Sequence, residues 1–159
     1  MEECVFCKIA NKEIKSYKIY SGKEFMAIMD IFPPTFDNKI TMPTVLIITK
    51  QHYGSNVFED APEKIFLKAI KLTRKIARAM QLALKPERVC LMTEGTEINH
   101  FHIKLYALYK EYYPGYLSSM KGPDNKATQA DKKWLKQTAK KIRIALKEIK
   151  KLEKEKKKN

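Results

Sequence analysis

The stretch Ile98–Tyr106 constrains the fold of this chain more than any other. Polar and apolar residues alternate along it, which indicates a half-buried β-strand with one face against a core. Side chains at i, i+2 and i+4 share one face, so His100, His102 and Lys104 point the same way. The apolar residues of the other face are Phe101, Ile103 and Leu105. Two of the three histidines therefore lie in one row with an ammonium group, which favours a site for an anion, a metal, or both.

Length and composition indicate one globular domain. A chain of 159 residues with 44% apolar residues is long enough to bury a core without cross-links. No apolar run is long enough to span a bilayer. The first residues, Met1–Glu3, are acidic and no apolar segment follows, so a signal peptide is not expected. We expect a cytoplasmic protein.

The net charge of +14 is unevenly distributed. Residues 131–159 contain 13 Lys or Arg and 4 Asp or Glu, a net charge of +9, and the rest of the chain carries +5. A lysine-rich helix end is most often a solvated face. Clustered positive charge also binds phosphates without reading sequence, so weak nucleic-acid contact through the basic C-terminus stays open.

Apolar periodicity and turn residues predict an α+β fold with an antiparallel sheet. The expected strands are 17–20, 25–29, 44–49, 88–93 and the histidine strand, with a loop over 35–43 and a turn over 112–115. A long helix begins at Asp60 as cap, with Glu63 reaching back, and ends at Lys85–Pro86. A second helix begins near Thr128, where Asp131 completes a cap pattern. Its expected apolar stripe is Trp134, Ile142, Ala145, Ile149 and Leu152.

The cysteine spacing favours a metal site over a disulfide framework. Cys4 and Cys7 can supply two thiolates from one turn, and a tetrahedral zinc site then needs two further ligands. His52 and His100 are the obvious candidates. The alternatives are two free thiols on a loose N-terminus and a redox pair, and the latter is disfavoured because no strand precedes the motif. Cys90 lies in an apolar run and is expected in the core.

This assignment leaves His102 free to react. A neutral imidazole is a good nucleophile near physiological pH, and it can attack phosphorus. Lys104 and backbone amides near Gly95 would then hold the charged oxygens. The plainer alternatives are an ordinary partly buried histidine at 102 and a solvated lysine at 104.

Four short segments, in this order and at this spacing, resemble the HIT (histidine triad) superfamily. They are Cys4–Ile9, Ala27–Pro33, Ile47–His52 and Glu94–Leu105. The resemblance covers the chain from Cys4 to about Tyr106 and implies a HIT-like antiparallel sheet with one long packed helix. The expected division is a HIT-like domain over 1–127 and a basic C-terminal helix over 128–159, packed on that domain or extending from it.

The resemblance also implies roles for individual residues. His102 would be the nucleophile, and His100 would bind zinc together with Cys4, Cys7 and His52, as in zinc-bearing relatives. The substrate-binding positions would be Asp30 on the ribose hydroxyls, Gly95 beside the phosphate, and Thr93 and Lys104 in the same site. The family's activity implies an AMP-like nucleotide held with its α-phosphorus near His102, and its members commonly form homodimers.

The chain departs from the family pattern at several of these positions. The third triad residue is Lys104 rather than histidine, and Thr93 stands where one branch uses asparagine. Glu97 replaces a serine near the phosphate, and we expect it to face solvent or to pair with Lys104. The loop after Asp30 is longer than usual. These departures bear on substrate choice and rate more than on fold.

The sequence therefore predicts a nucleotide hydrolase or transferase that cleaves a phosphoramidate or phosphoanhydride bond at the α-phosphorus through a nucleotidyl-histidine. A structural Zn²⁺ is the expected cofactor. Two alternatives remain: a nucleotide- or RNA-binding module with weak catalysis, and a zinc-stabilised scaffold. Three single residues also have plainer explanations than a role in the site. Asp30 could simply stabilise the turn before Pro33–Pro34, His52 could be a surface residue, and Thr93 could be present for its β-strand propensity.

Overall fold

A five-stranded antiparallel sheet forms the centre of the protein in our computed structural model, which describes residues 4–36, 40–110 and 129–156. The strand order is β1-β2-β5-β7-β6, and every neighbouring pair is antiparallel. The strands are β1 (Lys18–Ser21), β2 (Phe25–Met29), β5 (Thr44–Thr49), β6 (Arg88–Met92) and β7 (His102–Leu108). The α+β architecture with an antiparallel sheet is as the sequence predicts.

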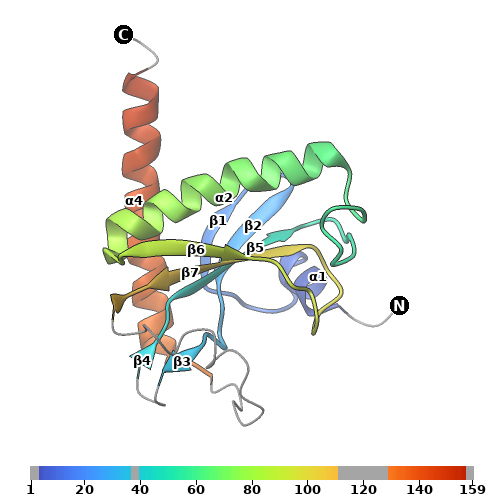
Figure 1. Cartoon of the computed structure of the whole chain (residues 1–159), viewed down its shortest axis with the longest axis horizontal. Helices are drawn as coiled ribbons and strands as arrows, with labels where there is room; N and C mark the ends of the chain where they lie inside the picture. Colours follow the sequence, from blue (N-terminus) through green and yellow to red (C-terminus); the bar gives the residue numbers. More distant parts are fainter. Residues whose placement is uncertain (1–3, 37–39, 111–128, 157–159) are drawn as a thin grey trace.

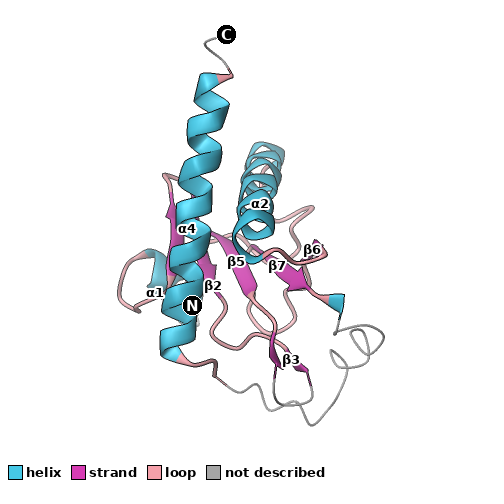
Figure 2. Cartoon of the chain, turned by 90° about the vertical axis from the view of Figure 1, so that its left-hand side faces the viewer, coloured by secondary structure: helices cyan, strands magenta, loops and turns pink. Residues whose placement is uncertain are grey.

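Three helices cover the sheet within the part of the chain that the structure describes. The two long helices, α2 (Glu63–Leu84) and α4 (Lys132–Glu155), lie side by side over one face (Figures 1 and 2). The short α1 (Val5–Ala10) packs on the other face, where its Phe6 meets Met26 and Ile48. Each face of the sheet is thus covered at its centre, and β5 is buried at all six positions, as expected for a central strand with the sequence TVLIIT.

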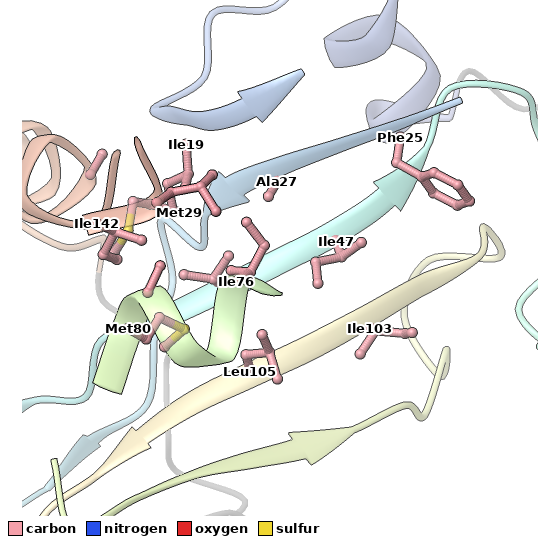
Figure 3. Close-up of a cluster of buried hydrophobic side chains, with 14 of the residues drawn as sticks. Ile19, Phe25, Ala27, Met29, Ile47, Ile76, Met80, Ile103, Leu105 and Ile142 are labelled. Carbon is pink, nitrogen blue, oxygen red and sulfur yellow. The ribbon is translucent and has the colours of Figure 1, made fainter. Parts of the chain in front are cut away.

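The main core lies between the sheet and the two long helices (Figure 3). Ile103 and Leu105 of β7 point into it together with Ile47 of β5, and Ile76 of α2 and Ile142 of α4 cover them. The apolar residues Phe101, Ile103 and Leu105 therefore pack as the alternation predicts, but the strand begins at His102, and residues 98–101, which were predicted to be part of it, lie outside it. Because α4 contributes seven buried residues, the basic helix is amphipathic and anchored rather than free.

Several local predictions needed correction. The segment predicted as a loop over 35–43 contains two short paired strands, β3 (Thr35–Phe36) and β4 (Ile40–Thr41). Asp60 does not cap α2: Pro62 holds the cap position, and the Asp60 carboxylate accepts a hydrogen bond from the Asn56 backbone instead. Leu152 is 55% exposed and lies off the buried stripe of α4. The predicted turn at 112–115 and the predicted start at Thr128 lie outside the described residues.

Other helix ends agree with the prediction. The Asp131 side chain accepts a hydrogen bond from the Trp134 backbone at the start of α4. α2 ends at Leu84, where Lys85 adopts a left-handed conformation immediately before Pro86. Among the described residues, no helix is both apolar enough and long enough to cross a membrane.

Candidate functional site

His102 is the first residue of β7, and its surroundings fix both its tautomer and its charge. It is 4% exposed, and its Nδ1 lies 2.7 Å from the backbone carbonyl of His100. A carbonyl only accepts hydrogen bonds, so Nδ1 carries the proton and Nε2 keeps its lone pair. Burial lowers the pKa of His102, and nearby Lys104 acts in the same direction. The ring is therefore a neutral imidazole with one basic nitrogen left for a ligand.

A cavity of about 310 Å³ opens beside this ring. Three segments that are distant in the sequence form its walls: α1, the segment that follows β2, and the segment between β6 and β7. The polar residues around it are Lys15, Ser16, Asp30, Glu94, Thr96, Glu97, His102 and Lys104, and the apolar ones include Phe6, Ile28, Phe32, Leu46 and Ile98. An apolar cleft with a few convergent polar groups is the usual form of a small-molecule site.

Asp30 stands where β2 ends, at the edge of the cavity. Its carboxylate accepts a hydrogen bond of 2.9 Å from the Phe32 backbone, so it has the turn role that the sequence also allowed. Burial raises the pKa of Asp30, and the Phe32 hydrogen bond, Lys104 and His102 oppose that rise. One carboxylate is thus held at the cavity by a backbone contact, with its second oxygen available to a ligand.

Lys104 lies two residues beyond His102 on the same face, as the alternation predicts. Its ammonium group is hydrogen-bonded to the Glu94 carboxylate. Glu94 follows β6, in which Met92 is the residue opposite Lys104, so the strand register brings the two side chains together. Glu97 lines the same cavity and is exposed, the first of the two orientations expected for it.

Thr93 and Gly95 shape the backbone beside the cavity and are not among its lining residues. The Thr93 hydroxyl donates a hydrogen bond of 3.1 Å to the carbonyl of His102 and so ties β7 to the end of β6. Gly95 has a φ of +62°, and a Cβ there would lie 2.2 Å from the Cβ of Ser55. Both the conformation and the contact require glycine.

Four candidate metal ligands come together behind His102. Cys4, Cys7, His52 and His100 each offer one ligand atom, and these atoms all lie within 4.8 Å of one another. The Sγ atoms of Cys4 and Cys7 lie 3.3 and 3.6 Å from Nδ1 of His100. His52 Nδ1 lies 3.2 Å from the same atom. Tetrahedral ligands around one zinc ion are about 3.3 to 3.8 Å apart, so the cluster has the right size for a metal.

The chemistry of the cluster also fits a cation. His100 is fully buried, and its Nε2 donates a hydrogen bond of 2.9 Å to the Thr49 carbonyl, which leaves the Nδ1 lone pair facing the thiols. Burial, reinforced by the neighbouring Cys4, raises the pKa of the Cys7 thiol to about 11. Without a cation, the thiolate form is therefore disfavoured, and binding a metal would displace the protons.

Phe6 lies between the four candidate metal ligands and the cavity, a connection that sequence reasoning missed. Its ring contacts His100 and His102 edge-on, with centroid distances of 5.6 and 5.2 Å. It is carried by α1, between the two cysteines, and it lines the cavity. The position of Phe6 between the two cysteines was the sequence signal for this cavity wall. If both cysteines bind one metal ion, the backbone between them is fixed, and the Phe6 side chain is fixed with it.

A model of the HIT domain family matches residues 11–110 of the chain. The chain belongs to the HIT domain family. An uncharacterized HIT-like protein of Borreliella burgdorferi is 36% identical over 81 residues, which cover 51% of this chain and 52% of that protein. The HIT protein of Bacillus subtilis is 30% identical over 115 residues, which cover 68% of this chain and 72% of that protein.

A third relative of this HIT protein has a named activity. The adenosine 5'-monophosphoramidase of Saccharomyces cerevisiae is 29% identical over 79 residues, 50% of this chain and 45% of the yeast protein. The chain thus covers about half the length of the Borreliella and yeast relatives.

Solved structures agree on the fold. A hypothetical histidine triad nucleotide-binding protein of Sulfolobus tokodaii superposes with a TM-score of 0.74 at 23% identity, covering 92% of this chain and 94% of that one. A zinc-bound histidine triad family protein of Mycobacterium smegmatis gives a TM-score of 0.69 at 20% identity, covering 94% and 97%. At these identities the likeness concerns fold alone.

Proposed function

We propose that this HIT protein transfers or hydrolyses a nucleotide at its α-phosphorus, with His102 as the nucleophile. The observation that carries the proposal is the buried, neutral imidazole of His102, whose Nδ1 proton is held by a backbone carbonyl while its ring borders a cavity. The membership in the HIT family and the likeness to a yeast phosphoramidase support the same chemistry. The substrate class would be a nucleoside phosphoramidate or a phosphoanhydride.

The reaction would proceed in two displacements. The Nε2 lone pair of His102 attacks the α-phosphorus, an N–P bond forms, and the bond to the leaving amine or phosphate breaks as that group takes up a proton from solvent. Water then attacks the same phosphorus, the N–P bond breaks with its electron pair returning to Nε2, and the proton that water loses goes to solvent, so that the nucleotide and neutral His102 are released. The His100 carbonyl stabilises the imidazolium character that develops in between, because it accepts the hydrogen bond from Nδ1–H.

Three further residues would position the substrate. Lys104 would hold a phosphate oxygen as a point charge, once Glu94 releases it. Asp30, which lines the same cavity, would accept hydrogen bonds from the ribose hydroxyls. Thr93 and Gly95 would act through the backbone, the first by fixing the His102 carbonyl and the second by allowing the tight turn before the phosphate.

Cys4, Cys7, His52 and His100 would hold a structural Zn²⁺. Two thiols and two imidazole nitrogens form a typical closed zinc donor set, and the Mycobacterium smegmatis protein of the same fold is zinc-bound. Bound zinc would fix α1 against the sheet. Phe6 is carried by α1 and packs on the His102 ring, so fixing α1 would also fix the orientation of the His102 ring.

Incubation with adenosine phosphoramidate, followed by chromatography for AMP, tests the proposal. We expect turnover by the wild type and a loss of at least about a thousandfold in His102→Ala, with an unchanged circular dichroism spectrum. The intact mass of the wild type, quenched in alkaline denaturant during turnover, should include a nucleotidyl adduct that is absent from the variant. Full activity in His102→Ala would remove it as the nucleophile.

A nucleotide-binding module with weak catalysis is the second candidate. The Glu94–Lys104 pair favours this second function, because Glu94 neutralises the Lys104 ammonium group that would bind the phosphate. The same assay separates the two functions. AMP binding measured by calorimetry without any AMP production from the phosphoramidate would favour the binding module, and absence of both would favour a metal-stabilised scaffold.

A further inference from the structure

Nearly all of the net positive charge lies on two helices. α2 carries a net charge of +5 and α4 carries +7, so together they account for +12 of the net charge of +14. The two helices lie side by side on the face of the sheet opposite the cavity of His102 (Figures 1 and 2). A lysine-rich composition alone would spread charge over the whole surface. Here it is concentrated on one side.

Five of the six cations of α2 form one stripe. Residues 64, 68, 71, 75 and 78 are Lys, Lys, Lys, Lys and Arg, at alternating intervals of four and three. This spacing keeps all five on one side of a helix. With a rise of 1.5 Å per residue the stripe is about 21 Å long. Like charges at these intervals destabilise a helix slightly, and within the described part of the chain only Lys68, Lys75 and Arg78 are offset by ion pairs with Glu24 or Glu153.

The middle of this stripe borders a cleft of about 240 Å³. The cleft lies where α2, α4 and the β1–β2 hairpin meet, and its lining residues are Tyr20, Glu24, Phe25, Lys68, Lys71, Leu72, Lys75, Leu146 and Lys150. We name it the lysine cleft. Four ammonium groups from two helices surround a space that is large enough for a phosphate group.

The acidic residues nearby neutralise only part of this charge. Lys68 pairs with Glu24 at 2.5 Å, and Lys75 pairs with Glu153 at 3.6 Å. Lys150 lies 5.1 Å from the centre of the Tyr20 ring, and neither it nor Lys71 has an ion-pair partner among the described residues. The cleft therefore has two uncompensated cations at its centre, an arrangement that a bound anion would stabilise.

We propose that the lysine cleft and the α2 stripe bind the phosphate backbone of a nucleic acid without reading its bases. A row of cations along a helix matches a repeating polyanion better than it matches a single anion. The lysines sit in a concave cleft between two helices, which a phosphodiester chain enters and a flat lipid surface does not. The aromatic ring that Lys150 contacts in the cleft, that of Tyr20, has this cation over a face on which a base would otherwise stack.

This contact differs from the one expected from the sequence, which placed it on the C-terminal end. It also lies across the sheet from His102, so binding there and turnover at His102 are separable. The charge-reversed pair Lys71→Glu and Lys150→Glu removes the two unpaired lysines and touches no residue of the nucleotide site. A matched control, Lys12→Glu with Lys110→Glu, changes the net charge equally at two exposed positions outside both long helices.

Fluorescence anisotropy with a labelled single-stranded RNA of 20 nucleotides, over a series of salt concentrations, tests the proposal. We expect the cleft pair to weaken binding at least about tenfold at 0.1 M salt and to reduce the slope of log K against log salt by about 1.4, about 0.7 for each lost phosphate contact. The control pair should stay within about twofold, because the Debye length of about 10 Å screens distant charges.

Each remaining outcome decides against the proposal. Equal losses in both pairs would mean that binding follows net charge alone. Loss of binding on removing residues 156–159 would assign it to the tail, and stronger binding to vesicles containing phosphatidylserine would assign the surface to a membrane. Phosphoramidate turnover and the thermal midpoint report on folding, and Lys71→Gln with Lys150→Gln replaces the reversed pair if that pair unfolds.

Discussion

At the scale of single residues, the pairing of Lys104 with Glu94 is the feature that most affects ligand binding. A phosphate oxygen that contacts Lys104 has to displace a carboxylate of the same charge. An exposed ion pair contributes at most about 1 kcal/mol, so we expect Glu94→Gln to tighten AMP binding by up to about fivefold, measured by calorimetry. Glu97→Gln, with the same charge change in the same cavity, is the control. An equal gain in both variants, or weaker binding in Glu94→Gln, contradicts competition for Lys104.

The lowered pKa of His102 predicts the pH dependence of the reaction. Only the neutral ring is a nucleophile, and burial and Lys104 favour that form. Activity should therefore persist below pH 6.5, the ordinary histidine value, and the acid limb of kcat should lie under it. A cation bound at the His100 cluster would shift the pKa in the same direction. In Lys104→Gln the limb should move toward higher pH, and an unmoved limb would mean that another group titrates.

The lowered pKa of His102 also affects the stability of the fold. It lets activity persist at acidic pH, but it makes the folded chain less stable there. The unfolded chain binds a proton to this histidine more readily than the folded chain does, so stability falls as pH drops below about 6.5. Asp30 works the other way, since its raised pKa means that its ionised form is disfavoured in the folded chain. Above the ordinary aspartate pKa, the ionised Asp30 carboxylate therefore lowers the stability of the fold. A ligand that donates hydrogen bonds to this carboxylate would offset that loss.

Which side chains would meet in the site was only partly predictable. Period-two alternation placed His102 and Lys104 on one face, because that depends on local geometry alone. The partner of Lys104 could not be read from the chain. It depends on the register between β6 and β7, where Met92 faces Lys104 and brings Glu94 within reach.

At the scale of elements, long or strongly patterned segments were predicted best. β5 and the end of α2 follow from a β-branched run and from Lys85–Pro86. The start of α2 did not follow, because the Asp60 carboxylate has a competing partner in the Asn56 backbone, beside Gly54. The short α1 has only six residues and no side-chain cap, so nothing in its own sequence distinguishes it from a loop.

This weakness of α1 predicts a dependence on metal. A six-residue helix is not stable by itself, and the Cys4–Cys7 pair is its attachment to His52 and His100. We expect Cys4→Ser to lower the zinc-to-protein ratio, measured by atomic emission, and the thermal midpoint together. A loss of about 2 kcal/mol corresponds to about 4–8 °C at this chain length. Cys90→Ser is the control, and an unchanged metal ratio in Cys4→Ser would defeat the assignment.

At the scale of the whole molecule, the two faces of the sheet differ in chemistry. One face holds the cavity with His102 and its neighbouring carboxylates, and the other holds the two basic helices. The sequence indicated an excess of charge at the C-terminus, yet α2 carries as much net charge as the whole chain before residue 131. Only the packing of α2 beside α4 reveals that these charges form one surface.

The sheet edge at β6 supports a homodimer, which the family resemblance also implies. No described strand pairs with the outer side of β6, and Leu91 there is 51% exposed. An apolar edge strand of this kind is normally covered by another strand, and in a symmetric dimer the same edge of a second chain covers it. We expect light scattering to give twice the chain mass of 18.6 kDa.

The variant Leu91→Lys places a charge on this edge and should reduce the mass to that of one chain, since edge lysines oppose strand pairing. Leu152→Lys is the matched control, because Leu152 is similarly exposed on α4, away from the sheet. It should leave the dimer intact. If the wild type has the mass of one chain at all concentrations, or if both variants dissociate alike, β6 is not the contact.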